Sequence, residues 1–155
     1  MSADPPPSAF RHQHDDPRGL IERIEAQLRE RIAEAVEMAG LKLMVDLRER
    51  AGRPAPETTS EADRREFLET AAALLRHLRE AFHAGLPPEE RAALEAAEAA
   101  PADSQDRVLA GQVFLARQLP DYWQRFESYR AAYFEDRLSA PAPRAGWLRR
   151  LLGHP

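Results

Sequence analysis

The sequence predicts an all-α protein: a helical bundle of four to five helices with a long antiparallel first hairpin. Ala, Leu, Glu and Arg dominate the chain and favour helix, whereas β-branched residues are scarce. Apolar residues recur at steps of three and four, and the alternating apolar and polar runs typical of strands are absent. A chain of 155 residues fits a single domain with one modest core.

The first helix is expected over residues 18–50, because its apolar residues lie on one stripe. That stripe consists of Ile21, Ile24, Leu28, Ile32, Val36, Ala39, Leu43 and Leu47. Four further residues widen it towards the end of the helix: Met38, Leu41, Met44 and Val45. A helix this broadly apolar is either central to its own bundle, the favoured interpretation, or in contact with a second subunit. A homodimer through the first hairpin therefore stays open.

Glycine and prolines after residue 50 end the first helix, and Ser60 with Asp63 is expected to cap a second helix that runs to Ala84. Its buried face is predicted to be Phe67, Ala71, Leu74, Leu75, Leu78 and Phe82. A third helix, residues 88–99, is expected on the surface because Leu94 is its only large apolar residue.

A fourth helix is predicted to begin near Ser104, and a fifth to span residues 121–138 after the break at Pro120. The fifth is aromatic, with arginines interleaved, as in proteins that stack single-stranded nucleic acid. Acidic residues cancel that charge locally, so we interpret the aromatic face as core packing. Tyr122 and Trp123, at the start of the helix, are the expected exposed contact residues.

The chain divides into four predicted parts. A disordered N-terminal tail (residues 1–17) precedes the bundle (18–138), and a Pro/Ala linker (139–145) leads to a C-terminal amphipathic docking segment (146–153). The candidate partner-binding residues are Trp147, Leu148, Arg149, Arg150, Leu151 and Leu152. Their apolar members have the spacing of one face of a two-turn helix.

Three targets suit this segment: a groove on a protein partner, an anionic membrane surface, or the chain's own bundle. Gly146-Trp147-Leu148-Arg149-Arg150 also resembles the C-terminal targeting peptides of encapsulin cargo proteins, which likewise follow Pro/Ala-rich linkers. The resemblance implies a cargo-type protein that docks through this segment.

A weak metal-ligand candidate lies on the second helix, where His77, Glu80 and His83 are spaced by three. Glu80 with His83 has the Glu-x-x-His spacing of ferritin-like bundles, but no second such motif is present. A site could be completed across a dimer by glutamates of the first helix. We favour partly exposed histidines, with His83 placed at a helix C-terminus, and expect no metal or other cofactor.

Composition and motifs narrow the function classes. A net charge of −4 disfavours nucleic acid as a partner, and the lack of cysteine excludes thiol chemistry. Glycine-rich phosphate loops and a recognisable nucleophile triad are absent, so we expect no enzyme. No signal peptide is expected, and the Arg-, Ala- and Pro-rich composition suggests a bacterial, cytoplasmic protein. The predicted function is a non-enzymatic interaction protein of the adaptor, scaffold or cargo type. The alternatives are a ferritin-like metal-binding oligomer and a peripheral membrane protein.

Overall fold

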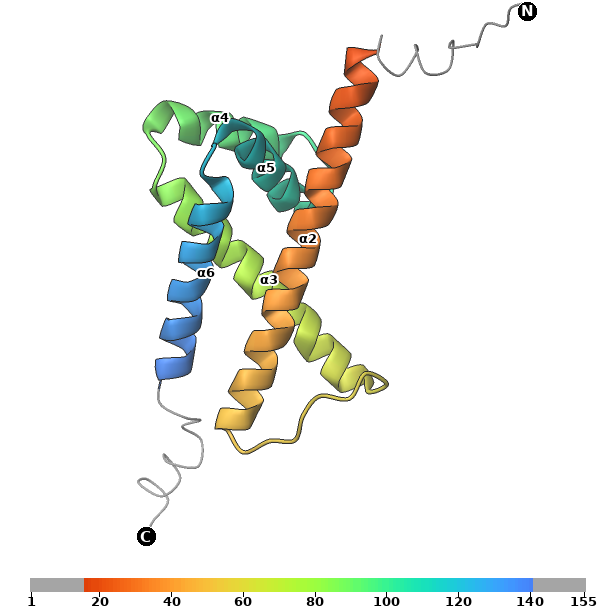
Figure 1. Ribbon diagram of the computed structural model, residues 1–155, viewed down its shortest axis with the longest axis vertical. Coiled ribbons are helices and arrows are strands. Elements are labelled where there is room, and N and C mark those ends of the chain that lie inside the picture. The colour runs from red at the N-terminus through yellow and green to blue at the C-terminus, as the bar shows by residue number, and fades with distance from the viewer. Residues whose placement is uncertain (1–15, 141–155) are drawn as a thin grey trace, which may run out of the picture.

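The computed structural model describes residues 16–140, apart from the side chains of residues 104 and 105. This part contains α2 (Pro17–Arg50), α3 (Glu61–Ala84), α4 (Pro88–Ala99), α5 (Ser104–Gln118) and α6 (Tyr122–Ser139), and no strand (Figure 1). The predicted fold class, an all-α helical bundle, is thereby confirmed. The predictions for the N-terminal tail and for the docking segment fall almost wholly on residues 1–15 and 141–155, outside the described residues.

Local sequence signals set the ends of the first two helices. The Asp16 carboxylate accepts a hydrogen bond from the backbone N–H of Gly19 at 3.0 Å and so caps α2, and Pro17 occupies its first turn. The chain then turns at Gly52, whose φ of 71° suits glycine. Ser60 Oγ accepts from the Asp63 N–H at 3.2 Å, which confirms the predicted cap of α3.

The helices α2 and α3 cross obliquely, and α5 and α6 pack against both of them (Figure 1). The core at this junction combines aliphatic and aromatic side chains from all five helices and from the α3–α4 turn. Its fully buried apolar members are Ile32, Leu43, Met44, Leu74, Leu78, Phe82, Leu86, Leu94, Leu115, Tyr122 and Phe126. Gly40 meets Ala71 at the crossing of α2 and α3.

The predicted apolar stripe of α2 is buried only in part. Ile21 and Ile24 are each 41% exposed, whereas Ile32 and Leu43 are fully buried. The N-terminal turns of α2 extend beyond the helices that cover its middle (Figure 1), so burial of Ile21 and Ile24 was a wrong prediction. Periodicity identifies the apolar face of a helix but not how much of its length a partner covers.

Tyr122 also differs from its predicted role as an exposed contact residue. It is 1% exposed and stacks on Phe82, with ring centroids 4.9 Å apart, while Trp123 is half-buried beneath the guanidinium group of Arg31. The reason is that α6 begins beside the C-terminal half of α3, where its first turn enters the core rather than solvent.

The third helix of the prediction, α4, is confirmed as a largely exposed element that packs on α5. Its single large apolar residue, Leu94, is nevertheless completely buried. Within the described residues, none of the helices combines the length and the apolar character needed to span a membrane.

Candidate functional site: the groove between α2 and α3

A groove of about 700 Å³ lies between the C-terminal half of α2, the loop of residues 51–60 and the N-terminal half of α3. Its apolar lining comprises Leu41, Met44, Val45, Ala55, Pro56, Phe67 and Leu68. Its charged lining comprises Glu37, Glu57, Asp63 and Arg64. We call this feature the α2–α3 groove. Its lining is largely apolar with charged residues beside it, a combination that suits an amphipathic segment.

Exposed apolar side chains border the α2–α3 groove on both helices. Leu41 is 44% exposed and Leu68 51% exposed, and Met38, one helical turn before Leu41, is 72% exposed. Met44, by contrast, is buried in the floor. The two explanations for the widened stripe of α2 thus apply to different residues: Met44 belongs to the bundle core, while Met38 and Leu41 form an uncovered face.

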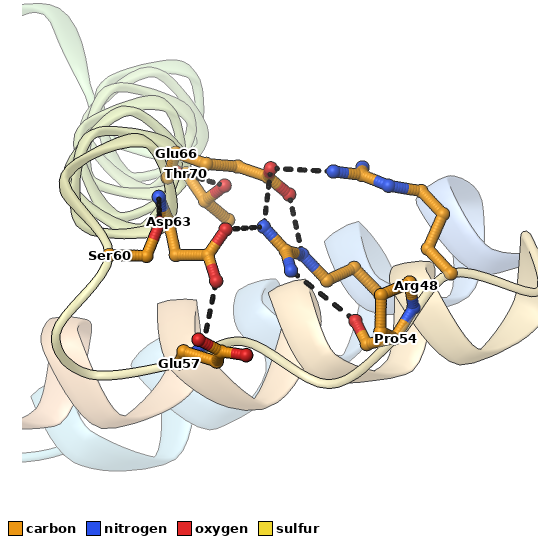
Figure 2. A network of polar contacts seen from close by, with 8 residues as sticks. Arg48, Pro54, Glu57, Ser60, Asp63, Glu66 and Thr70 are labelled. Carbon is orange, nitrogen blue, oxygen red and sulfur yellow. Dashed lines mark hydrogen bonds and ion pairs between the residues drawn. The ribbon is translucent and has the colours of Figure 1, made fainter.

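Arg48 holds the wall of the groove together from its buried position on α2 (Figure 2). Its Nη2 donates to Asp63 Oδ1 at 2.6 Å and to Glu66 Oε1 at 2.9 Å, both on α3. Its Nη1 donates to the carbonyl of Pro54 at 3.3 Å, and so reaches the loop as well. One guanidinium group therefore joins α2, the loop and α3, with the fork geometry that suits carboxylates.

The loop is tied to α3 a second time. The other oxygen of the Asp63 carboxylate, Oδ2, accepts a hydrogen bond from the backbone N–H of Glu57 at 2.7 Å (Figure 2). Glu66 Oε1 also accepts a hydrogen bond at 3.2 Å from Nη2 of Arg53, an exposed residue of the loop. Each of these contacts joins two different segments among α2, the loop and α3. The network therefore holds the loop in place between the two helices rather than stabilising one helix alone.

The pKa values of both carboxylates of this network are lowered from their ordinary values. The hydrogen bond from Arg48 lowers the pKa of Asp63, and the Glu57 N–H lowers it further. The hydrogen bond from Arg48 also lowers the pKa of Glu66, with a smaller contribution from Arg53. Both groups therefore stay ionised at neutral pH, and burial of Arg48 is compensated by two negative partners.

The free charges around the α2–α3 groove are mainly acidic. Glu37 and Glu57 are exposed, and within the described residues their carboxylates form no ion pair. Arg64 supplies the one positive group of the lining. Asp63 adds no free charge because Arg48 already neutralises it. A ligand with apolar and positive side chains would match this surface.

The structure does not gather the metal-ligand candidates. The ring of His77 packs on Tyr133 of α6, with centroids 4.4 Å apart, while His83 Nε2 lies 2.8 Å from Glu95 Oε2 of α4. Glu80 is exposed between them. Among residues 16–140, no group of three or more His, Asp or Glu side chains could hold a metal ion.

The other predicted site, the run from Trp147 to Leu152, lies outside the described residues. The Arg48 network was not predicted from the sequence, because the partners of Arg48 follow it by 15 and 18 residues. One signal was available: Arg48 lies four residues after Met44, so it falls on the buried side of α2.

The described part of the chain is thus an all-α helical bundle with an open apolar groove on its surface. No family model matches the chain, and no curated protein or solved structure is significantly similar to it. The function proposed below rests on the groove and on the sequence.

Proposed function

We propose that the protein is a non-enzymatic interaction protein, an adaptor or scaffold, that binds an amphipathic segment of a protein partner in the α2–α3 groove. The observation that carries this proposal is a groove of about 700 Å³ whose lining includes the exposed side chains of Leu41 and Leu68, with the exposed Met38 one helical turn before Leu41. Apolar surface left uncovered in this way marks interaction sites, and helical ligands bind such grooves through side chains one turn apart.

The groove is suited to binding because its shape is fixed beforehand. Arg48 ties the loop and α3 to α2, so the groove wall is ordered without a ligand. Binding to a preformed groove avoids the entropic cost of ordering a loop on association. The acidic rim residues, Glu37 and Glu57, would favour a partner with basic residues beside its apolar face.

The C-terminal segment, residues 146–153, is the second binding element in this proposal. It carries the apolar and basic side chains that suit a groove with an acidic rim. On its Pro/Ala tether this segment binds a second protein, separate from the partner held in the groove. An adaptor of this design holds one partner through its body and another through its tail.

We further propose that the protein acts in the bacterial cytoplasm. The chain has no cysteine, so its fold does not need the oxidising compartments in which disulfides form. The bias towards Arg over Lys, with Lys42 the sole lysine, is typical of a GC-rich bacterial genome. The partner sought is therefore a cytoplasmic protein, with homodimerisation as a distinct outcome of the test.

Site-specific photocrosslinking in cells tests the proposal. A photoreactive amino acid in place of Leu68 should give a discrete adduct with another protein, and Leu41→Glu should abolish that adduct. The matched control replaces Glu80, an exposed residue on the other half of α3, and should not give it. The proposal fails if the two positions give the same adducts, or if the adduct at position 68 is a dimer of this chain.

A further inference from the structure

We propose that, in the free protein, the chain's own C-terminal segment, Trp147 to Leu152, occupies the α2–α3 groove. This inference rests on the proposed function, because the same groove then serves the partner. The C-terminal segment then acts as an internal competitor that the partner must displace. Three observations support this occupant: the direction in which the chain leaves α6, the charges of groove and segment, and the position of the other apolar surface.

The chain leaves α6 at the end of the bundle that holds the groove. Trp123, in the first turn of α6, lies under Arg31 of α2, with the guanidinium carbon 4.3 Å from the ring centroid. From this contact both helices run in the same direction, so Ser139 and Arg50 finish at the same end of the molecule (Figure 1). The last described residues of the chain, at the end of α6, therefore lie at the same end of the molecule as the last turns of α2.

The length of the linker fits this placement. Residues 141–146 span at most about 20 Å when extended. Leu41 and Val45, which line the groove, lie within about 15 Å of the last residue of α2 along its axis. Packed helices are separated by about 8–10 Å. These two distances together exceed the linker for Leu41, but Val45 lies only about 8 Å from the end of α2. A linker of this length can thus carry Trp147 past the end of α2 to the nearer part of the groove beside Val45, but not to the far end of the bundle.

The chemistry of the segment complements that of the groove. Trp147, Leu148, Leu151 and Leu152 supply apolar side chains for a lining formed by Leu41, Met44, Val45, Phe67 and Leu68. Arg149 and Arg150 supply positive charge, and the segment has no acidic residue. The rim offers the unpaired carboxylates of Glu37 and Glu57 against the single positive group of Arg64. Opposite charges at a rim fix orientation and exclude other ligands.

The other uncovered apolar face does not meet these conditions. Leu20, Ile21 and Ile24 are exposed near the start of α2, at the opposite end of that helix from Arg50. The linker does not reach them. The alternating Glu and Arg side chains around them, including Glu22 and Arg23, give no excess of acid to attract an apolar-basic segment.

A second copy of the chain is a less suitable occupant of the groove. The three exposed large side chains that border it, Met38, Leu41 and Leu68, are few for a specific dimer, which buries about 800 Å² on each partner. A tethered segment needs less area, because a short linker gives it an effective concentration of the order of millimolar. The C-terminal segment therefore needs only a weak intrinsic affinity to occupy the α2–α3 groove.

Disulfide trapping in the full chain tests the inference, and the absence of native cysteine makes it free of background. The pair Leu68→Cys with Leu148→Cys should form an intramolecular disulfide in the monomer under mild oxidation. The control pair, Glu80→Cys with Leu148→Cys, should form it about tenfold more slowly. Equal rates for the two pairs would overturn the inference, and a disulfide-linked dimer would assign the groove to a second copy.

Charge reversal separates specific docking from random encounter. Arg149→Glu with Arg150→Glu should slow trapping at position 68, and adding Glu37→Arg with Glu57→Arg should restore it. Failure of both changes to alter the rate contradicts the charge complementarity on which the inference depends. Because Glu37 and Glu57 are exposed, their substitution keeps the bundle core unchanged.

A last comparison distinguishes this inference from the proposed function. Replacing Trp147, Leu148 and Leu151 by alanine should increase the partner adduct formed by the photoreactive group at position 68, because the competitor is lost. If trapping succeeds but neither form gives a partner adduct, the proposed function fails and the internal contact stands. If the adduct forms equally with and without these substitutions, the internal contact is wrong and the proposed function stands.

Discussion

Gly40 of α2 lies directly against Ala71 of α3. A Cβ atom placed on Gly40 would fall 3.0 Å from both Cα and Cβ of Ala71, and 3.2 Å from its backbone nitrogen. The two small residues thus allow the backbones of α2 and α3 to approach closely at their crossing. This contact sets how the first two helices diverge on either side, and hence where the α2–α3 groove opens.

Gly40→Ala should destabilise the protein by about 1–2 kcal/mol in urea denaturation, although alanine favours helix. The clash is with backbone atoms of Ala71, which cannot rotate away. In a double-mutant cycle, Ala71→Gly should reduce the cost of Gly40→Ala, since it removes the opposing Cβ, and the cycle cancels the cost of about 1 kcal/mol of glycine in a helix. A Gly40→Ala variant more stable than the parent would show that the helices are free to separate.

Arg48→Met should lower the melting temperature by roughly 10 °C, because it leaves Asp63 and Glu66 without their shared cation. Arg125→Gln is the matched control, since it removes an ion pair with Asp121 within one turn of α6. That pair is partly exposed, so its loss should shift the melting temperature by only about 2 °C. Equal shifts for the two variants would argue against a bracing role for Arg48.

Stability should fall on acidification. The pKa values of Asp63 and Glu66 are lowered from ordinary values of 3.8 and 4.5 in the folded state. Each carboxylate therefore contributes stability that is complete above its unfolded pKa and is lost as the pH falls through its folded pKa. Urea midpoints measured between neutral pH and pH about 3 should decline most below pH about 4.5. This decline should be shallower in Arg48→Met.

A buried polar pair offers a test of the core. Tyr122 Oη donates to Gln112 Oε1 at 2.7 Å, and both side chains are inaccessible to solvent. Gln112 Nε2 has no hydrogen-bond partner among the described residues. Tyr122→Phe should therefore cost about 1–2 kcal/mol, since it leaves the whole amide unpaired. Adding Gln112→Leu should recover stability, and a further loss in urea denaturation would contradict this account.

The residues that border the groove should be dispensable for folding. Met38→Ser and Leu68→Ser should each change the free energy of unfolding by less than about 0.5 kcal/mol, because both side chains are largely exposed. Leu74→Ala, at a fully buried position of α3, should cost about 3 kcal/mol. Large losses for the first two variants would mean that Met38 and Leu68 serve the core rather than a ligand.

The helices themselves were predictable because their signals are local. Ser60 caps α3 through an N–H three residues ahead, and Pro88 occupies the first turn of α4. Such contacts involve neighbours in the sequence, so composition and spacing are enough to place the helix ends. The same signals predicted the apolar face of α3, where Leu74, Leu78 and Phe82 are fully buried.

The candidate site was less predictable, because its features depend on residues far apart in the sequence. The sequence predicted an unusually wide apolar face on α2, but not that Met44 would be covered while Met38 and Leu41 stayed exposed. It also gave no reason to pair Arg48 with Asp63 and Glu66. Each outcome depends on where α3 crosses α2.

By itself, then, the sequence determined that this chain is helical, where its helices end, and which face of each helix is apolar. The tertiary structure decided how much of each face is covered: Ile21 and Ile24 are left exposed, Tyr122 is buried, and a groove opens beside Gly40 and Ala71. The physical reason is the sequence separation over which the interactions act. Helix formation is governed by contacts within about four residues, whereas burial and grooves follow from the angle at which distant helices meet.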